Sequence, residues 1–286
     1  MAPKKKDKLD LSPDLPLGDA ARTLLAPQHQ RLRQCLPKAL RGDVDSLHDV
    51  RVAIRRTRCI LRAFKPMLRH TKVDRVEKEL ARMGDAMGPT RDMDVLLGFT
   101  RRKKLARILG ADPTWPPLEM RLRALHTFEK RRMVARLSGR EWARMDRNLK
   151  QLAKATSNVG AGTTLPEFAG EELERLLGRV MKKKPLARSK NADRLHELRI
   201  AIRKARLFAQ LVEPVLDEEA GGRIAELKDM ERAIGRLHDA DFAASILTQM
   251  ETTVPKGLSS FLEKRRAKAF KKFHRLWSAF STPSPS

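Results

Sequence analysis

The segment LHDVRVAIRRTR at Leu47–Arg58 returns almost unchanged as LHELRIAIRKAR at Leu195–Arg206. Two further elements recur in the same order: AMGPTRDMDV at Ala86–Val95 returns as AIGRLHDADF at Ala233–Phe242, and EKRR at Glu129–Arg132 returns at Glu263–Arg266. Recurrence of several elements in one order is the sequence signature of a duplicated structural unit. The sequence therefore predicts two halves with the same helical plan.

Each copy of the first element has the spacing of an amphipathic helix. Apolar side chains recur at alternating intervals of three and four residues, which is the period of one buried helix face. In the first copy this seam consists of Leu47, Val50, Ile54, Thr57, Leu61, Phe64 and Leu68. In the second copy it consists of Leu195, Leu198, Ile202, Ala205 and Val212. Both segments are predicted to be helices that bury these seams.

A shift of one residue along either copy, which is a rotation of about 100°, leads from the apolar seam to a row of cationic side chains. The first basic row is His48, Arg51, Arg55, Arg58, Arg62 and Arg69, with Arg56 on its flank. The second basic row is His196, Arg199, Arg203 and Arg206, with Lys204 on its flank. Neighbouring like charges on a helix repel one another. The basic rows therefore predict either an anionic ligand or acidic partners on other helices.

The composition also favours an anionic partner. The 286 residues include 61 Lys and Arg against 35 Asp and Glu, so the formal net charge is +26. Such self-repulsion favours binding to nucleic acid, an anionic membrane surface or another polyanion, with an inert basic surface as the alternative. The hydrophobic fraction of 41%, rich in Leu and Ala and without Tyr, suits packed helices better than sheets.

Two cysteines, Cys35 and Cys59, lie far apart in the sequence and form no CxxC pair. This speaks against a zinc ribbon or a disulfide scaffold and fits a reducing compartment. The sequence has no apolar run of membrane-spanning length and no signal peptide, so we expect a cytoplasmic protein.

Changes in composition suggest where the halves begin and end. Residues 1–14 and 281–286 are predicted to be disordered tails, and TSNVGAGTTLP at 156–166 is predicted to link a first half, 15–155, to a second half, 167–280. The third repeated element recurs at a shorter interval than the first two, which predicts a longer Pro-rich loop around 111–117 in the first half.

Motifs for a specific metal site or catalytic mechanism are matched only weakly by this sequence. HELR at His196 lacks the second histidine of a zinc-protease motif. Asp92 with Asp94, and Asp239 with Asp241, have the carboxylates for a divalent cation, but helix capping after the preceding glycine or ion pairing with arginine explains them better. The sequence offers no recognisable catalytic set, so we expect no enzyme activity, no cofactor and no metal site.

The repeated motifs carry a family resemblance. The pattern His-x-x-Arg-Val/Ile-x-Ile-Arg-Arg/Lys-x-Arg, followed by Gly-x-x-Arg-Asp-x-Asp, resembles the CHAD family, the conserved histidine α-helical domain. The second pattern is matched in the first half by Gly88, Arg91, Asp92 and Asp94, and in the second half by Gly235, Asp239 and Asp241, with His238 in place of the arginine. LSGREW at Leu137–Trp142 also resembles the family's pattern, and the resemblance runs from about Leu17 to Phe280.

The resemblance implies an all-α fold of two four-helix bundles related by internal pseudo-twofold symmetry, with accessory helices. It also implies binding of inorganic polyphosphate in a basic groove or pore, often beside polyphosphate-handling enzymes or on storage granules. The family residues that transfer to this sequence are His48, Arg51, Arg55, Arg58, His196, Arg199, Arg203 and Arg206. The family is frequently fused to a triphosphate tunnel domain with a Glu-x-Glu-x-Lys strand, and this sequence has no such element.

The predicted polyphosphate site extends beyond the transferred residues. It adds cations of the basic rows and of the repeated EKRR element: Arg56, Arg62, Lys204, Arg131, Arg132, Arg265 and Arg266. Nucleic-acid binding remains an alternative, although aromatic residues for base stacking are only 5% of the chain. A third alternative is a scaffold on polyphosphate or polyhydroxyalkanoate granules, bound through the amphipathic segment 261–280 with Phe270, Phe273 and Trp277. The role of last helix in the second bundle explains this segment better.

Overall fold

The structure, a computed structural model, describes residues 11–68, 72–137, 139–152, 162–189, 191–250 and 252–281. These residues form helices and turns without any strand, which confirms the all-α class. The first half contains α1 (Leu17–Leu40), α2 (Val44–Ala63), α3 (Val73–Ala86), α4 (Gly88–Thr100), α5 (Lys103–Gly110), α6 (Trp115–Leu137) and α7 (Arg140–Leu152). The second half contains α8 (Leu165–Met181), α9 (Ala192–Val212), α10 (Glu218–Gln249) and α11 (Lys256–Ser281). Three short 3-10 helices accompany them: η1 (Lys65–Met67), η2 (Lys184–Arg188) and η3 (Glu213–Val215).

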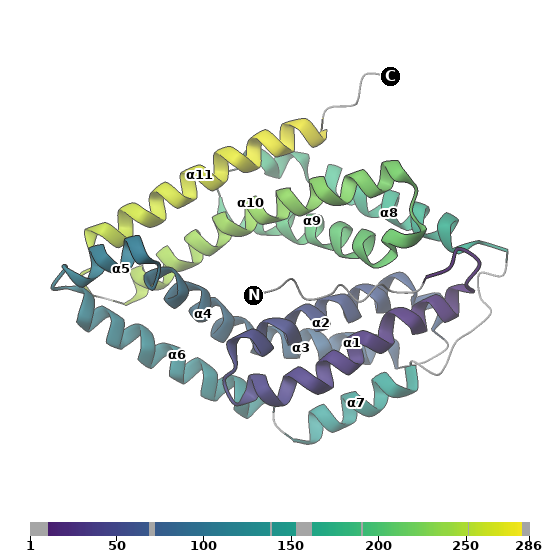
Figure 1. The fold of residues 1–286 in the computed structure, drawn as a ribbon, viewed down its shortest axis with the longest axis horizontal. Helices are drawn as coiled ribbons and strands as arrows, with labels where there is room; N and C mark the ends of the chain where they lie inside the picture. Colours follow the sequence, from purple (N-terminus) through teal and green to yellow (C-terminus); the bar gives the residue numbers. More distant parts are fainter. Residues whose placement is uncertain are drawn as a thin grey trace.

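The repeated elements fall on matching helices of the two halves. The first element lies on α2 and α9, and each packs against the helix before it, α1 or α8. The second element lies on α4 in the first half and within the long α10 in the second half (Figure 1). The two differ because Pro89 has no amide hydrogen to continue the helix ladder, so α3 ends at Ala86, whereas Arg236 at the equivalent position lets α10 continue.

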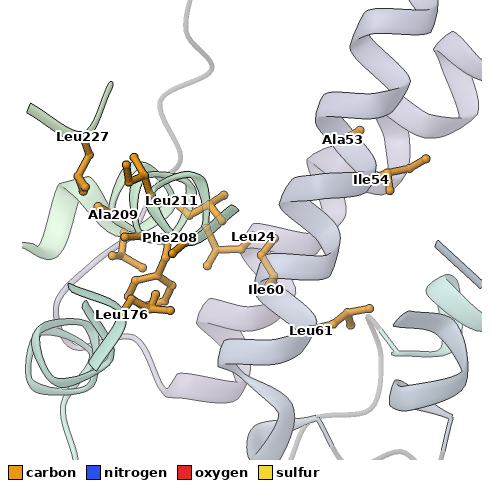
Figure 2. Packing of buried hydrophobic residues seen from close by; sticks show 14 of the residues in the cluster. Leu24, Ala53, Ile54, Ile60, Leu61, Leu176, Phe208, Ala209, Leu211 and Leu227 are labelled. Carbon is orange, nitrogen blue, oxygen red and sulfur yellow. The ribbon is translucent and has the colours of Figure 1, made fainter. Parts of the chain in front are cut away.

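Both predicted apolar seams are buried, which confirms the amphipathic reading of α2 and α9. Ile54 and Ile202, at the middle of each seam, are 1% and 0% exposed. The seams belong to one hydrophobic cluster that spans both halves, and Figure 2 shows Leu24 of α1 and Ile60 of α2 near Phe208 and Leu211 of α9. Because the halves share this core, the faces of α2 and α9 beside the seams are held close together.

A second hydrophobic cluster holds the two halves together at the end of the molecule where α5 lies. It combines residues of α4, α5 and α6 with residues of α10 and α11, including Leu96, Leu118, Leu247 and Leu262. This packing sets α4 against α10 and α5 against α11 (Figure 1). The second repeated motifs of the two halves are thereby brought face to face.

Several predicted boundaries differ from the observed ones. Leu11, within the predicted tail 1–14, is 6% exposed and packs in the core, and α8 begins at Leu165, inside the predicted linker 156–166. The Pro-rich segment around 111–117 is only partly a loop, because α6 starts at Trp115 and places Pro116 and Pro117 in its first turn. Predictions for residues 1–10, 153–161 and 282–286 fall outside the described residues. Within the described part of the chain, no helix combines the length and apolar character needed to cross a bilayer.

Candidate functional site

The two basic rows meet where α2 packs against α9. Arg51 and Arg55 of the first row lie close enough to Arg199 and Arg203 of the second for their charges to repel. We call these four residues the central arginine cluster. The structure thus brings together the middle of both predicted rows, which the sequence places almost 150 residues apart.

The charges of the central arginine cluster are destabilised in the folded protein. Burial, and then repulsion from Arg51, lowers the pKa of Arg55 to about 10. Burial, and then repulsion from Arg199 and Arg55, lowers the pKa of Arg203 to about 9. Both side chains remain cationic at neutral pH, so the fold holds unfavourable positive charge at this point that an anion would relieve.

Backbone groups hold part of the cluster. Arg51 donates from Nη1 to the carbonyl oxygen of Gly84 at 2.8 Å, and Arg55 donates from Nε to the carbonyl oxygen of Arg51 at 3.2 Å. The Nε of Arg199 is buried and has no hydrogen-bond partner among the described residues. Among those residues, no carboxylate forms an ion pair with Arg51, Arg55 or Arg199.

The glycine of the second repeated motif faces the arginine of the first in both halves. A Cβ on Gly88 would lie 3.7 Å from Nη1 of Arg51, and a Cβ on Gly235 would lie 3.9 Å from Nε of Arg199. A side chain larger than methyl at either glycine would extend into the space of these guanidinium groups. The two repeated motifs therefore build one site, with the glycines leaving room for the arginines.

Carboxylates neutralise the outer parts of the basic rows. Glu77 of α3 accepts from Arg58 at 2.8 Å and from Arg62 at 2.5 Å. Glu231 of α10 pairs with Arg206, and one of its oxygens lies 3.8 Å from Nε of Arg203. Acidic partners on other helices thus explain part of each row. Arg51, Arg55 and Arg199, at the centre of the rows, have no such ion pair among the described residues.

Asp92 of α4 and Asp239 of α10 lie near the central arginine cluster, and the charge of Asp239 acts on Asp92. Burial raises the pKa of both carboxyl groups. Arg51 opposes this rise at Asp92 and Arg199 opposes it at Asp239, whereas the charge of Asp239 raises the pKa of Asp92 further. Neither aspartate caps a helix, because Asp92 follows the first turn of α4 and Asp239 lies inside α10. The capping explanation for these motifs is therefore wrong, since α10 continues through Gly235.

The second aspartate of each motif contacts a side chain of another helix. Asp94 lies 2.9 Å from Nε2 of His126 on α6, and Asp241 accepts from Nε of Arg266 on α11 at 2.5 Å. The expected ion pairing with arginine is thus confirmed for Asp241 with Arg266, and Asp94 also lies 3.9 Å from Nη1 of Arg91. The contacts with His126 and Arg266 join α4 to α6 and α10 to α11. In the described part of the chain, no three His, Cys, Asp or Glu side chains gather as metal ligands.

Three histidines border the central arginine cluster. Partial burial, and then the charge of Arg91, lowers the pKa of His48, which stays open to solvent on one side. Burial and then Arg199 lower the pKa of His196. The ring of His238 lies 5.1 Å from that of His196, and burial followed by Arg199 lowers the pKa of His238 to about 4.

The amino ends of α2 and α9 are capped by their own side chains. Asp43 accepts a hydrogen bond from the backbone amide of Ser46 at 2.6 Å. Asn191 accepts from the amides of Asp193 and Arg194 at 2.9 and 3.1 Å. These caps occupy one amide at the start of α2 and two at the start of α9, which leaves fewer helix-end donors for an anion.

The remaining predicted residues lie at various distances from the cluster. Arg56 is near Arg206 and Arg31, and exposed Lys204 borders a cavity of about 330 Å³ together with Arg179 and Lys183. On α6, Arg131 is exposed to solvent. Arg132 donates a hydrogen bond to Glu129 of the same helix at 2.9 Å. Arg265 of α11 lies over the ring of Phe99, and Arg69 is outside the described residues.

Sequence reasoning missed several residues at this site. Glu77 and Glu231 occupy different repeat positions, so no shared motif marks them. Arg91 and His238, in contrast, occupy equivalent positions of the second motif, and each lies beside the histidine of its own half. Their position in the repeat was the signal that could have added them to the predicted site.

Fold and site together define an all-helical protein with a polycationic centre assembled from two repeats. The sequence matches the CHAD domain family over residues 18–248, and the chain belongs to that family. It is similar in structure to the crystal structure of the CHAD domain from the plant Ricinus communis, with a TM-score of 0.72 and 16% identity over 96% of each chain. It is also similar to PptA from Streptomyces chartreusis, with a TM-score of 0.71 and 18% identity over 92% of this chain and 100% of that one. A comparison with curated proteins gives no match.

Proposed function

We propose that this protein binds inorganic polyphosphate, without catalysis, through the central arginine cluster. The observation that carries the proposal is the convergence of Arg51 and Arg55 with Arg199 and Arg203, four mutually repelling guanidinium groups from two repeats. The CHAD family, which is associated with polyphosphate binding, supports the same ligand class.

The chemistry of the cluster suits a phosphate chain. Guanidinium groups present planar pairs of donors that match phosphate oxygens and keep their charge at neutral pH. Polyphosphate has charge along its whole length and no bases, so its recognition needs cations and no stacking surface. Binding would replace repulsion between arginines with attraction to the ligand, which should also stabilise the fold.

The two alternatives have less structural support. Nucleic-acid binding through stacked bases would need exposed aromatic rings beside the central arginine cluster. Scaffolding on an apolar granule would need an exposed apolar face on α11, yet Phe273, Trp277 and Phe280 of that helix are 0%, 5% and 7% exposed. That segment serves as the last helix of the second half.

A competition experiment tests the choice of ligand. Labelled long-chain polyphosphate bound to the protein should be displaced by unlabelled polyphosphate at lower concentration than by duplex DNA, single-stranded RNA or heparin. The logarithm of the affinity should also fall linearly with the logarithm of salt concentration, because bound arginines displace counter-ions. Stronger displacement by a nucleic acid, or an affinity independent of salt, would contradict the proposal.

Polyphosphate affinity should rise by roughly threefold to tenfold as the pH falls from about 8 to about 5. The free protein holds the pKa of His48, His196 and His238 below the ordinary value, and a bound anion would raise these pKa values. Binding then takes up protons. The increase in affinity is therefore complete at pH values below the histidine pKa values of the free protein, and it is lost as the pH rises through the histidine pKa values of the complex.

The measurement is the polyphosphate affinity at several pH values in the wild type and in the triple variant His48→Gln, His196→Gln and His238→Gln. The variant should lose most of the pH dependence, while titration of the ligand itself contributes equally to both proteins. Identical pH dependence in the two proteins would show that these histidines are not coupled to the ligand.

A further inference from the structure

A second group of arginines lies where α4 and α5 meet α11, at the left end of the view in Figure 1. The guanidinium carbons of Arg102 and Arg265 lie 4.9 and 4.4 Å from the ring centroid of Phe99. Phe99 is 3% exposed, so the ring is fixed in the core while it holds two cations. An aromatic ring attracts guanidinium groups without neutralising their charge.

Arg236 of α10 completes this second arginine cluster. Arg265 is repelled by Arg102 and by Arg236, and its Nε is buried without a hydrogen-bond partner among the described residues. Asp239 is the carboxylate that opposes this repulsion, and the same carboxylate also interacts with Arg199. One aspartate is therefore shared between the second arginine cluster and the central one, and positive charge remains in excess.

The second arginine cluster continues the central one along α4. Asp239 interacts with Arg199 of the central cluster and also with Arg91 and Arg102. Arg91 lies near the start of α4, and Arg102 lies just beyond its last residue, Thr100. Beyond them the cluster opens to solvent through exposed cations: Arg101, Lys103, Lys104 and Arg107.

Among the described residues, only the first half of the protein supplies the exposed cations that extend the second arginine cluster to solvent. The cations that open it to solvent lie at the end of α4 and on α5, and α5 has no counterpart in the second half, where α10 leads to α11 without an intervening helix. The basic surface around the central arginine cluster is therefore asymmetric, although the cluster itself draws equally on both repeats.

We propose that Arg102, Arg236 and Arg265 form a second phosphate-binding station, on which a long polyphosphate chain rests after leaving the central arginine cluster toward α5. The proposal rests on the proposed function and adds a length preference to it. Tripolyphosphate occupies the central arginine cluster alone, whereas a long chain reaches both stations. The second contact is then intramolecular and increases the affinity for long chains selectively.

The test compares tripolyphosphate with long-chain polyphosphate in the variant Arg102→Gln/Arg265→Gln. We expect its affinity for the long chain to fall by roughly tenfold or more, with the affinity for tripolyphosphate unchanged. For the long chain, the slope of the logarithm of affinity against the logarithm of salt concentration should become shallower by about two, one for each lost phosphate contact. Arg102→Gln alone should show about half of this change in slope. Because Arg102 is exposed, this single variant tests the proposal even if the double variant fails to fold.

The matched control is Arg140→Gln/Arg147→Gln, which removes two exposed positive charges from α7, at the lower edge of the view in Figure 1 and away from α5. The control should bind both ligands as the wild type does. An unchanged affinity of Arg102→Gln/Arg265→Gln for the long chain, or an equal loss for both ligands, would overturn the second station while leaving the proposed function intact. Absence of polyphosphate binding by the wild type would overturn both.

Discussion

Replacement of Arg55 and Arg203 together by methionine should weaken polyphosphate binding by roughly a hundredfold or more, without loss of thermal stability. Each substitution removes one partly buried guanidinium group from the central arginine cluster, and charge-assisted hydrogen bonds to phosphate are the strong ones. Methionine retains the apolar stem that packs against the helices. Burial and mutual repulsion disfavour both charges in the folded protein, so their removal should leave the melting temperature unchanged or raise it.

The control for this prediction is Arg140→Met/Arg147→Met, which removes two exposed arginines of α7. Affinity and melting temperature should be measured for both double variants under the same salt conditions. If the Arg55→Met/Arg203→Met protein binds polyphosphate about as well as the control does, the central arginine cluster is not the site. A loss of binding that follows a lower melting temperature would assign these arginines to the fold instead.

The substitution Glu231→Gln should change stability and affinity in opposite directions. Glu231 pairs with Arg206 and lies near Arg203, and the side chains of these three residues are 17%, 19% and 16% exposed. Removal of the carboxylate from a largely buried ion pair leaves cations without compensation, which should lower the free energy of unfolding by about 2–3 kcal/mol. The same loss frees positive charge for the ligand, so polyphosphate affinity should rise by roughly tenfold.

Denaturant unfolding and polyphosphate titration of the same variant measure these two effects. Glu226→Gln is the matched control, because Glu226 also lies on α10 but is half-exposed and pairs with Arg223 at 3.7 Å. This control should alter neither quantity by more than a few tenths of a kcal/mol. Weaker binding by Glu231→Gln would mean that the carboxylate positions Arg203 and Arg206 for the ligand rather than competing with it.

The sequence predicted the helices that build the site because their periodicity is local. The seams of α2 and α9 repeat at helical spacing, and the buried Leu47 and Leu195 that begin them are 3% and 2% exposed. Each basic row lies one residue away from its apolar seam. Because α2 and α9 pack in a shared core through these seams, the two basic rows also come close together.

Features that depend on pairing between helices could not be read from the sequence. Glu77 lies on α3 and Glu231 on α10, and neither is at a spacing that links it to the arginines it neutralises. The contact of Arg102 and Arg265 with Phe99 joins α4 to α11, which lie more than 150 residues apart. The glycines at positions 88 and 235 suggested a helix break in both halves, yet only the first half has Pro89 to produce one.

A calorimetric titration with tripolyphosphate, comparing the wild type with Arg55→Met in one half and Arg203→Met in the other, tests most directly whether the repeats share one site. The shared cluster predicts one high-affinity site per protein in all three cases, with weaker affinity in both variants. Two independent sites would instead give two sites in the wild type and, in each variant, one remaining site of undiminished affinity. That second result would contradict the central claim that arginines of both repeats bind one ligand together.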